Sequence, residues 1–265
     1  MPQYPGTGIW TLNDVRDYVQ GDPAYPTTQS ASDVWSLRDV HRAEAGDTWP
    51  RISVASSYSF NGTDSVLEFT NSALELGNYN SFTIECWHYS LASTQNSGAH
   101  IFCNSLGGSY HPIGLGYSSG DLIFNHSASG SWDILFATVV AQSNLIQNQW
   151  VHLAAVWDGS QVRVYYDGAF KYSASISTML VVDDFRIGRY NASFEGYISN
   201  LRIVTNNVLY TGTGSITVPT SPLTAITGTQ LLTCASNTVE DLSSNALTPT
   251  ANTTNVSIVS QTPFS

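Results

Sequence analysis

The chain has 265 residues, of which 42% are hydrophobic and 12% aromatic, enough for one large all-β domain or one domain with accessory segments. Only 11% are charged, and the net charge is −11 with Lys171 as the single lysine. Nucleic acids and anionic membranes are bound through Lys and Arg, so this balance excludes both as partners. No apolar run approaches the roughly 20 residues of a membrane span. The start lacks a signal-peptide pattern, so we expect synthesis in a reducing cytoplasm.

Residues 1–50 contain an internal repeat that predicts two short helices. The segment GIWTLNDVRDYVQGDPAYP recurs as DVWSLRDVHRAEAGDTWP, and Thr11-x-x-Asp14 and Ser36-x-x-Asp39 resemble N-terminal helix caps. Neither helix is long enough to be stable alone in water, so its apolar side chains must pack on this chain or on another protein. The residues assigned to attachment or assembly are Trp10, Leu12, Val15, Trp35, Leu37, Val40 and Trp49.

From residue 51 to residue 222 the chain is a series of short β-rich segments separated by turn signals. The most regular is 149–168, QWVHLAAVWDGSQVRVYYDG, in which Asp158-Gly159 joins two apolar runs and predicts a hairpin. Residues 106–120 are rich in glycine, and we expect a loop there. In 59–69 we expect a turn at Asn61-Gly62 and then a strand that contains Val66 and Leu67. The other expected strands are 81–91, 99–104, 121–125, 132–141, 150–157, 161–166, 184–188 and 195–204. In 81–91 neither face is plainly polar, which is typical of a central strand. The whole pattern predicts a β-sandwich or jelly roll.

Four motifs in order carry a resemblance to a known family. They are FNG…VLEF, SFTIECW, QWVHLAAVWDG…VRVYYDG and FRIGRY…FEGYISNLRI, and together they span about residues 57–204. The chain therefore resembles the laminin-G-like, concanavalin A-like jelly-roll family, which implies two antiparallel sheets. The flanks, YTG…PLTAI and the duplicated Trp-x-Leu segments, resemble virion proteins of tailed bacteriophages, particularly tail fibres and surface proteins.

The C-terminal segment, 223–265, is expected to complete the sandwich. In the family, a strand like QLLTC and a D-x-S-x-N segment precede the F-[DN]-G motif, but here Asp241, Ser243 and Asn245 follow the sandwich. The order therefore looks permuted. The segment would supply edge strands either in cis or, by strand addition, to a neighbouring copy in trans.

No catalytic residues are predicted. Retaining glycosidases need two carboxyl groups roughly 5–5.5 Å apart, which Glu-x-Asp spacing on a strand would supply. Glu68, Glu75, Glu85 and Glu195 are instead isolated in sequence. The histidines show no zinc-ligand spacing either. We therefore expect a protein that is not an enzyme, with a glycan-degrading enzyme as an alternative.

No cofactor is required by the sequence, and calcium is the ion that the resemblance implies. Jelly rolls of this family hold calcium at a loop rim with oxygen ligands from Asp, Asn and backbone carbonyls. Asp121, Asp158 and Asp184 are candidates by loop position. Asp158 has a simpler explanation as a turn residue.

The sequence favours a binding surface for carbohydrate. Neutral glycans are held by aromatic faces and by amide or hydroxyl hydrogen bonds, which need no net charge on the protein. The candidate ligand-binding residues are Tyr110, His111, Tyr117, Trp132, Tyr190 and Asn191. The alternative for each aromatic residue is that it packs in the core or a turn.

We interpret the chain as a non-enzymatic phage virion protein, a tail fibre or decoration protein, with a carbohydrate- or receptor-binding jelly roll. The expected partners are other virion proteins, further copies of the chain and a host-cell surface glycan. A purely structural cement protein of the capsid or tail, without glycan binding, is the alternative.

Overall fold

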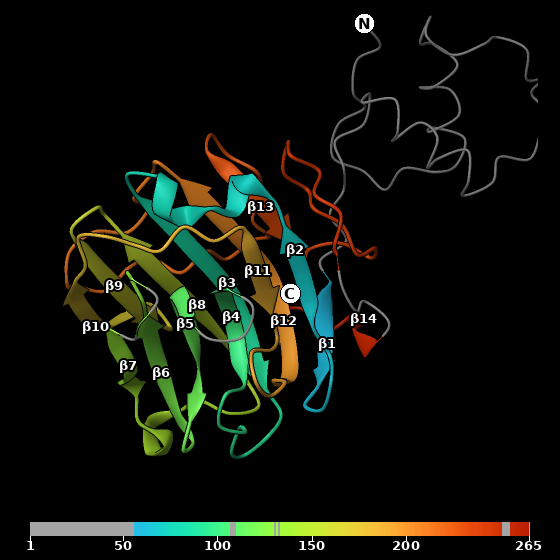
Figure 1. Cartoon of the computed structure of the whole chain (residues 1–265). Coiled ribbons are helices and arrows are strands. Elements are labelled where there is room, and N and C mark those ends of the chain that lie inside the picture. Colours follow the sequence, from blue (N-terminus) through green and yellow to red (C-terminus); the bar gives the residue numbers. More distant parts are fainter. Residues whose placement is uncertain (1–55, 107–109, 130, 132, 251–254, 265) are drawn as a thin grey trace, which may run out of the picture. The chain divides into compact units, whose positions relative to one another are not determined.

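The computed structural model describes residues 56–106, 110–129, 131, 133–250 and 255–264, all within one compact unit, Ser53–Ser265. Two antiparallel sheets lie face to face (Figure 1). The larger sheet has eight strands; seven follow in the order β10 (Ala169–Ser175), β9 (Gln161–Tyr166), β8 (Trp150–Trp157), β3 (Phe82–Ser90), β12 (Glu195–Thr205), β1 (Ser57–Asn61) and β14 (Ser257–Val259). The eighth, β13 (Thr229–Thr233), pairs with β12.

The smaller sheet has six strands. Their order is β2 (Leu67–Thr70), β11 (Asp184–Ile187), β4 (His100–Leu106), β5 (Tyr110–Ser118), β6 (Asp121–His126) and β7 (Ile134–Val140). The helices in this part of the chain are three short 3₁₀ turns, η1 (Ser72–Leu74), η2 (Leu76–Asn78) and η3 (Gln142–Asn144). The predicted all-β, two-sheet jelly roll is thus confirmed.

The β8–β9 hairpin shows why the sequence folds this way. Asp158 Oδ1 accepts hydrogen bonds from the backbone N–H groups of Ser160 and Gln161, which fixes the turn. Gly159 has a φ of +91°, a backbone conformation that residues other than glycine rarely adopt. Val162 and Val164 then alternate into the space between the sheets.

The main core fills the space between the two sheets. On β3, Phe82, Ile84 and Cys86 point into it, and all three side chains are fully buried. The other face of β3 is also covered, because Trp87 packs against Leu223 and Phe264. The expectation that this strand is central is confirmed, since β3 lies between β8 and β12.

A third layer covers the outer face of the larger sheet. Val208, Tyr210 and Ile216 pack against Ala154 and Tyr165 on that face. Residues 206–228 therefore form a strap over the sheet. Because β3 and β8 are covered on both faces, almost all of their residues are buried, and polar and apolar residues do not alternate along them.

The C-terminal segment pairs within the same chain in this structure. β13 pairs with β12, and β14 pairs with β1. Asp241, only 5% exposed, accepts hydrogen bonds from the N–H groups of Leu232, Ser243 and Leu247. The D-x-S-x-N segment is thus a capping loop that supports β13.

Two sequence expectations need comment. The loop predicted for residues 106–120 is wrong, because residues 110–118 form β5 in the middle of the smaller sheet. The helical repeat of residues 1–50 lies outside the described residues, so its attachment role stays a prediction. Within the part of the chain that the structure describes, no helix is long and apolar enough to cross a bilayer.

Candidate functional site

Four of the six predicted ligand-binding residues gather on the outer face of the smaller sheet. Tyr110 and His111 lie at the start of β5, and Tyr190 and Asn191 lie in the loop after β11. Tyr110 and Asn191 are both close enough to Tyr190 to perturb its hydroxyl group. The structure adds one residue that sequence reasoning missed, His100 of β4. We call Tyr110, His100, His111, Tyr190 and Asn191 the Tyr–His cluster.

The rings of this cluster pack edge to face. The ring centroids of His111 and Tyr190 are 4.4 Å apart, and those of His100 and Tyr190 are 5.2 Å apart. The two imidazole rings lie 5.0 Å from each other. Both histidines are buried, Tyr190 is half-buried and Asn191 is exposed. The tyrosine ring is therefore held in a fixed orientation between a buried imidazole layer and solvent.

Two glycines in β5 make room for the imidazole rings. A Cβ atom on Gly114 would lie 2.8 Å from His111 Cδ2, and one on Gly116 would lie 2.6 Å from His100 Cγ. Any other residue at either position would displace a ring. The glycines of β5 therefore do not mark a loop. They leave a flat surface on the outer face of the sheet, on which the two imidazole rings lie.

A chain of hydrogen bonds fixes His100. Its Nδ1 lies 3.1 Å from the carbonyl oxygen of Gly98, and its Nε2 lies 3.4 Å from the side-chain nitrogen of Asn125 on β6. These partners assign the proton to Nδ1, which donates to the carbonyl, while Nε2 accepts from the amide. The Gly98 carbonyl oxygen also accepts a hydrogen bond from the backbone N–H of Asn191. The same carbonyl group therefore holds both His100 and the backbone of Asn191.

Electrostatics keep the cluster uncharged near neutral pH. Burial lowers the pKa of His100 to about 4 and, reinforced by the neighbouring His100, that of His111 to about 2. Burial raises the pKa of the Tyr190 hydroxyl, partly offset by a hydrogen bond with the Asn191 side chain. Arg186, whose charge also acts on Tyr190, is paired with Glu68 at 2.7 Å. The surface can thus offer aromatic and amide contacts without a net charge.

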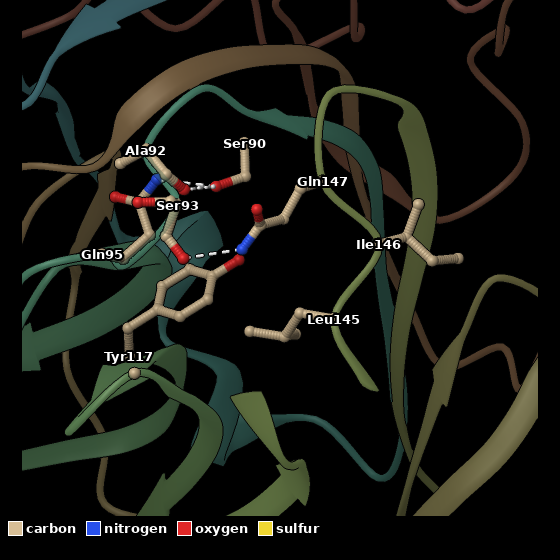
Figure 2. A pocket seen from close by; sticks show the side chains of 9 residues that line it. Ser90, Ala92, Ser93, Gln95, Tyr117, Leu145, Ile146 and Gln147 are labelled. Atoms are coloured by element: carbon tan, nitrogen blue, oxygen red, sulfur yellow. Dashed lines mark hydrogen bonds between the residues drawn. The ribbon is translucent and has the colours of Figure 1, made fainter. Parts of the chain in front are cut away.

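Tyr117, the fifth predicted residue, lies elsewhere and is only 1% exposed. It faces the core beside Phe194, and its ring reaches the bottom of a small pocket at the loop rim (Figure 2). The sixth, Trp132, lies outside the described residues. Tyr117 is absent from the Tyr–His cluster because successive residues of β5 face opposite sides of the sheet. Tyr117 faces the core, and its neighbour Gly116 faces the outer side.

The rim pocket is built by the loop between β3 and β4 and the loop before β8. Its cavity volume is about 10 Å³, room for about one water molecule, against about 300–1,000 Å³ for typical ligand sites. Gln147 Nε2 donates to the Ser93 carbonyl oxygen at 2.6 Å, which ties the two loops together (Figure 2). Its lining residues are Ser90, Ala92, Ser93, Gln95, Tyr117, Gly120, Leu145, Ile146 and Gln147.

The three candidate calcium ligands are used in separate local contacts. Asp121 accepts from Gln142 N and Thr138 Oγ1, Asp158 caps the β8–β9 turn, and Asp184 accepts from Thr70 Oγ1. Among the residues that the structure describes, no group of three or more His, Cys, Asp or Glu side chains could hold a metal ion. Calcium binding stays a prediction.

Glu85 of β3 is the centre of a buried polar network that sequence reasoning missed. Its Oε1 accepts from Arg202 Nη2 at 2.6 Å, and its Oε2 accepts from the Tyr210 hydroxyl at 2.7 Å and lies 3.2 Å from His152 Nε2. Burial alone would raise the pKa of the Glu85 carboxyl, but these partners outweigh it and hold that pKa below its usual value. The network lies beneath the strap, away from solvent.

The chain also matches a known family and known folds. A family model described as the concanavalin A-like lectin/glucanases superfamily matches residues 61–209, more than half of the chain. No curated protein matches it in sequence.

Among solved structures, a putative carbohydrate-binding protein from Bacteroides ovatus is similar at 16% identity and a TM-score of 0.49, over 77% of this chain and 59% of that one. Domains LG4-5 of the mouse laminin alpha1 chain match at 16% identity and a TM-score of 0.45, over 62% and 47%. A heptameric SAP-like pentraxin from Limulus polyphemus matches at 17% and 0.41, over 58% and 77%. This chain thus spans about half of the first two proteins, and at these identities the similarity concerns the fold alone.

Proposed function

Because the chain belongs to the concanavalin A-like lectin/glucanases superfamily, we propose that it is a carbohydrate-binding protein whose Tyr–His cluster takes an uncharged glycan. The observation that carries this proposal is the half-buried Tyr190 ring. The ring makes edge-to-face contacts with two buried imidazole rings, and the side chain of the exposed Asn191 lies beside its hydroxyl group.

The chemistry of this surface suits a sugar. An immobilised tyrosine ring offers an apolar face to the C–H face of a pyranose at little cost in side-chain entropy. The amide of Asn191 can donate to and accept from hydroxyl groups. Because both histidines are neutral near pH 7, nothing in the cluster requires a charged ligand.

We extend the proposal to a non-enzymatic role on the virion surface of a tailed bacteriophage. The support is the resemblance of the flanking segments to phage virion proteins. The partners would be other virion proteins, further copies of this chain and a host-cell surface glycan. A binding role also suits the carboxylates, since Glu85 lies buried in an ion pair rather than facing a cleft.

Calcium remains part of the proposal through the family resemblance. A divalent ion at the loop rim would be coordinated by carboxylate and carbonyl oxygens, with the partly exposed Asp121, Asp158 and Asp184 as the candidates. Binding assays with and without a chelator would detect such an ion.

The test is binding of the labelled full-length chain to immobilised neutral glycans and to candidate host cells. Tyr190→Ala and Asn191→Ala should each weaken saturable binding by about fivefold, since either contact contributes on the order of 1 kcal/mol. Asn80→Ala, an exposed amide in the loop before β3, is the matched control and should bind like the wild type. Absence of saturable binding to every glycan and permissive host would overturn the proposal in favour of a purely structural role.

A further inference from the structure

The edge strand β7 presents two adjacent apolar side chains to solvent. Leu135 is 46% exposed and Phe136 is 53% exposed, the largest value among the exposed large hydrophobic residues of the described chain. Exposed aromatic rings are common singly, so exposure alone says little. The backbone at this point is what sets the pair apart.

Phe136 has a φ of +56°, in the left-handed region that bulky side chains rarely adopt. The ladder shows the cause. Ile134 pairs with His126 and Ala137 pairs with Phe124, so Leu135 and Phe136 together oppose the single residue Asn125. This is a β-bulge, a device that redirects side chains and recurs beside functional sites.

The bulge directs both side chains to the outer face of the sheet. Ile134 and Ala137 pack against the core, and Val139 lies in it. The two residues between Ile134 and Ala137 therefore point away from the core, which accounts for their exposure. Asn125, which they oppose, lies on that same outer face, because its side-chain nitrogen reaches His100.

A hydrogen-bond chain joins the bulge to the Tyr–His cluster. The Phe136 N–H donates to Asn125 Oδ1 at 2.7 Å, and the Asn125 side-chain nitrogen lies 3.4 Å from His100 Nε2. His100 in turn bonds the Gly98 carbonyl, which accepts the N–H of Asn191. The strained backbone of Phe136 is thus held by the same network that orients the proposed binding surface.

We propose that Leu135 and Phe136 form a second contact platform for the glycan, so that the ligand is an extended oligosaccharide lying across the smaller sheet from Tyr190 to Phe136. This inference rests on the proposed function. The cluster rings sit over β4 and β5, and Phe136 stands on β7, two strands beyond β5. At the usual spacing of about 4.8 Å per strand, the span is roughly 10 Å, longer than one sugar ring.

The distinguishing variant is Phe136→Gly. Glycine adopts a positive φ without strain, so this variant should unfold at the same temperature as the wild type or higher, while the aromatic platform is gone. Phe136→Trp keeps a platform. Leu91→Ala removes another exposed apolar side chain, in the loop after β3, and is the matched control.

The measurement is the affinity of the full-length proteins for a ladder of neutral gluco-, galacto- and manno-oligosaccharides, from mono- to hexasaccharide. We expect Phe136→Gly to weaken hexasaccharide binding by about tenfold, the usual effect of losing one buried aromatic contact. Its monosaccharide affinity should match the wild type. Phe136→Trp and Leu91→Ala should bind both ligands like the wild type.

The outcomes separate the two proposals. If no saccharide binds the wild type, the proposed function fails and this inference fails with it. If Tyr190→Ala weakens binding while Phe136→Gly leaves every affinity unchanged, the proposed function stands and the platform is refuted. If Phe136→Gly instead dissociates an oligomer in sedimentation measurements and leaves hexasaccharide affinity intact, the surface contacts a second copy and the inference is overturned.

Discussion

Individual buried histidines make this protein sensitive to acid. Besides His100 and His111, burial lowers the pKa of His88 to about 3 and also lowers that of His126. A histidine whose pKa is lower in the folded state than in the unfolded chain takes up its proton only on unfolding. Its contribution to stability is complete above about pH 6.5 and is lost as the pH falls towards the folded-state pKa.

His100 allows a quantitative prediction. Because the pKa of His100 is about 4 in the folded protein, lowering the pH from 7 to 5 should reduce the free energy of unfolding by about 2 kcal/mol through this residue. His100→Gln keeps a donor for the Gly98 carbonyl but cannot be protonated. Urea unfolding at the two pH values should therefore show a smaller pH-dependent loss in the variant. An identical loss in both proteins would contradict the assignment.

Four of the predicted ligand-binding residues lie together in the structure, and two residues in contact with them were not predicted. Tyr110, His111, Tyr190 and Asn191 are recognisable in the sequence as polar and aromatic residues in segments expected to be loops. His100 and Asn125 are not, because their roles depend on which strands lie side by side. The glycines of β5 were misleading for the same reason: they mark where rings from β4 and β5 itself lie, not a turn.

At the scale of elements, the strap over the larger sheet is attached through side chains of that sheet. Arg202 Nη1 donates to the Thr224 carbonyl, Tyr210 donates to Glu85, and the Leu209 N–H donates to Thr83 Oγ1. The strap thus supplies partners for polar groups that would otherwise be buried and unsatisfied. Glu85 looked isolated in sequence because its partners come from β8, β12 and the strap.

Removing the charge at the centre of this network should be costly. Glu85→Gln leaves Arg202 buried without its counterion, and we expect a loss of about 3–5 kcal/mol in unfolding free energy. Glu68→Gln is the matched control, because it breaks the ion pair with Arg186, which is more exposed than the Glu85–Arg202 pair. This variant should lose about 1 kcal/mol or less of unfolding free energy. Denaturant unfolding of both variants decides the point, and equal losses would refute it.

At the scale of the whole molecule, three outer strands of the described sheets, β7, β10 and β2, carry features that oppose pairing with a further strand. The described structure places a bulge in β7 and another in β10, which also carries Lys171 at an exposed position. The outer edge of β2 is bonded by Thr250, whose N–H donates to the Glu68 carbonyl. Such features oppose edge-to-edge pairing at these three strands.

The C-terminal strands should be indispensable to the fold. A chain ending at residue 222 loses β13 and β14 and uncovers the partly apolar edges of β12 and β1, so we expect it to lack a cooperative thermal transition and near-ultraviolet circular dichroism. A chain ending at residue 260 keeps both strands and should fold. A folded monomer from the shorter chain would show that the strands are dispensable.

The pairing of β1 with β14 also has a consequence for how the protein is made. The first described strand of the larger sheet lies between β12 and the last strand in the sequence. Because a ribosome adds residues in order, β1 lacks its β14 neighbour until residues 257–259 have been synthesised. The nascent sandwich therefore remains incomplete until β14 has emerged from the ribosome, and its long-range pairings make folding slow. Chaperone occupancy on the emerging chain should therefore persist until β14 has emerged.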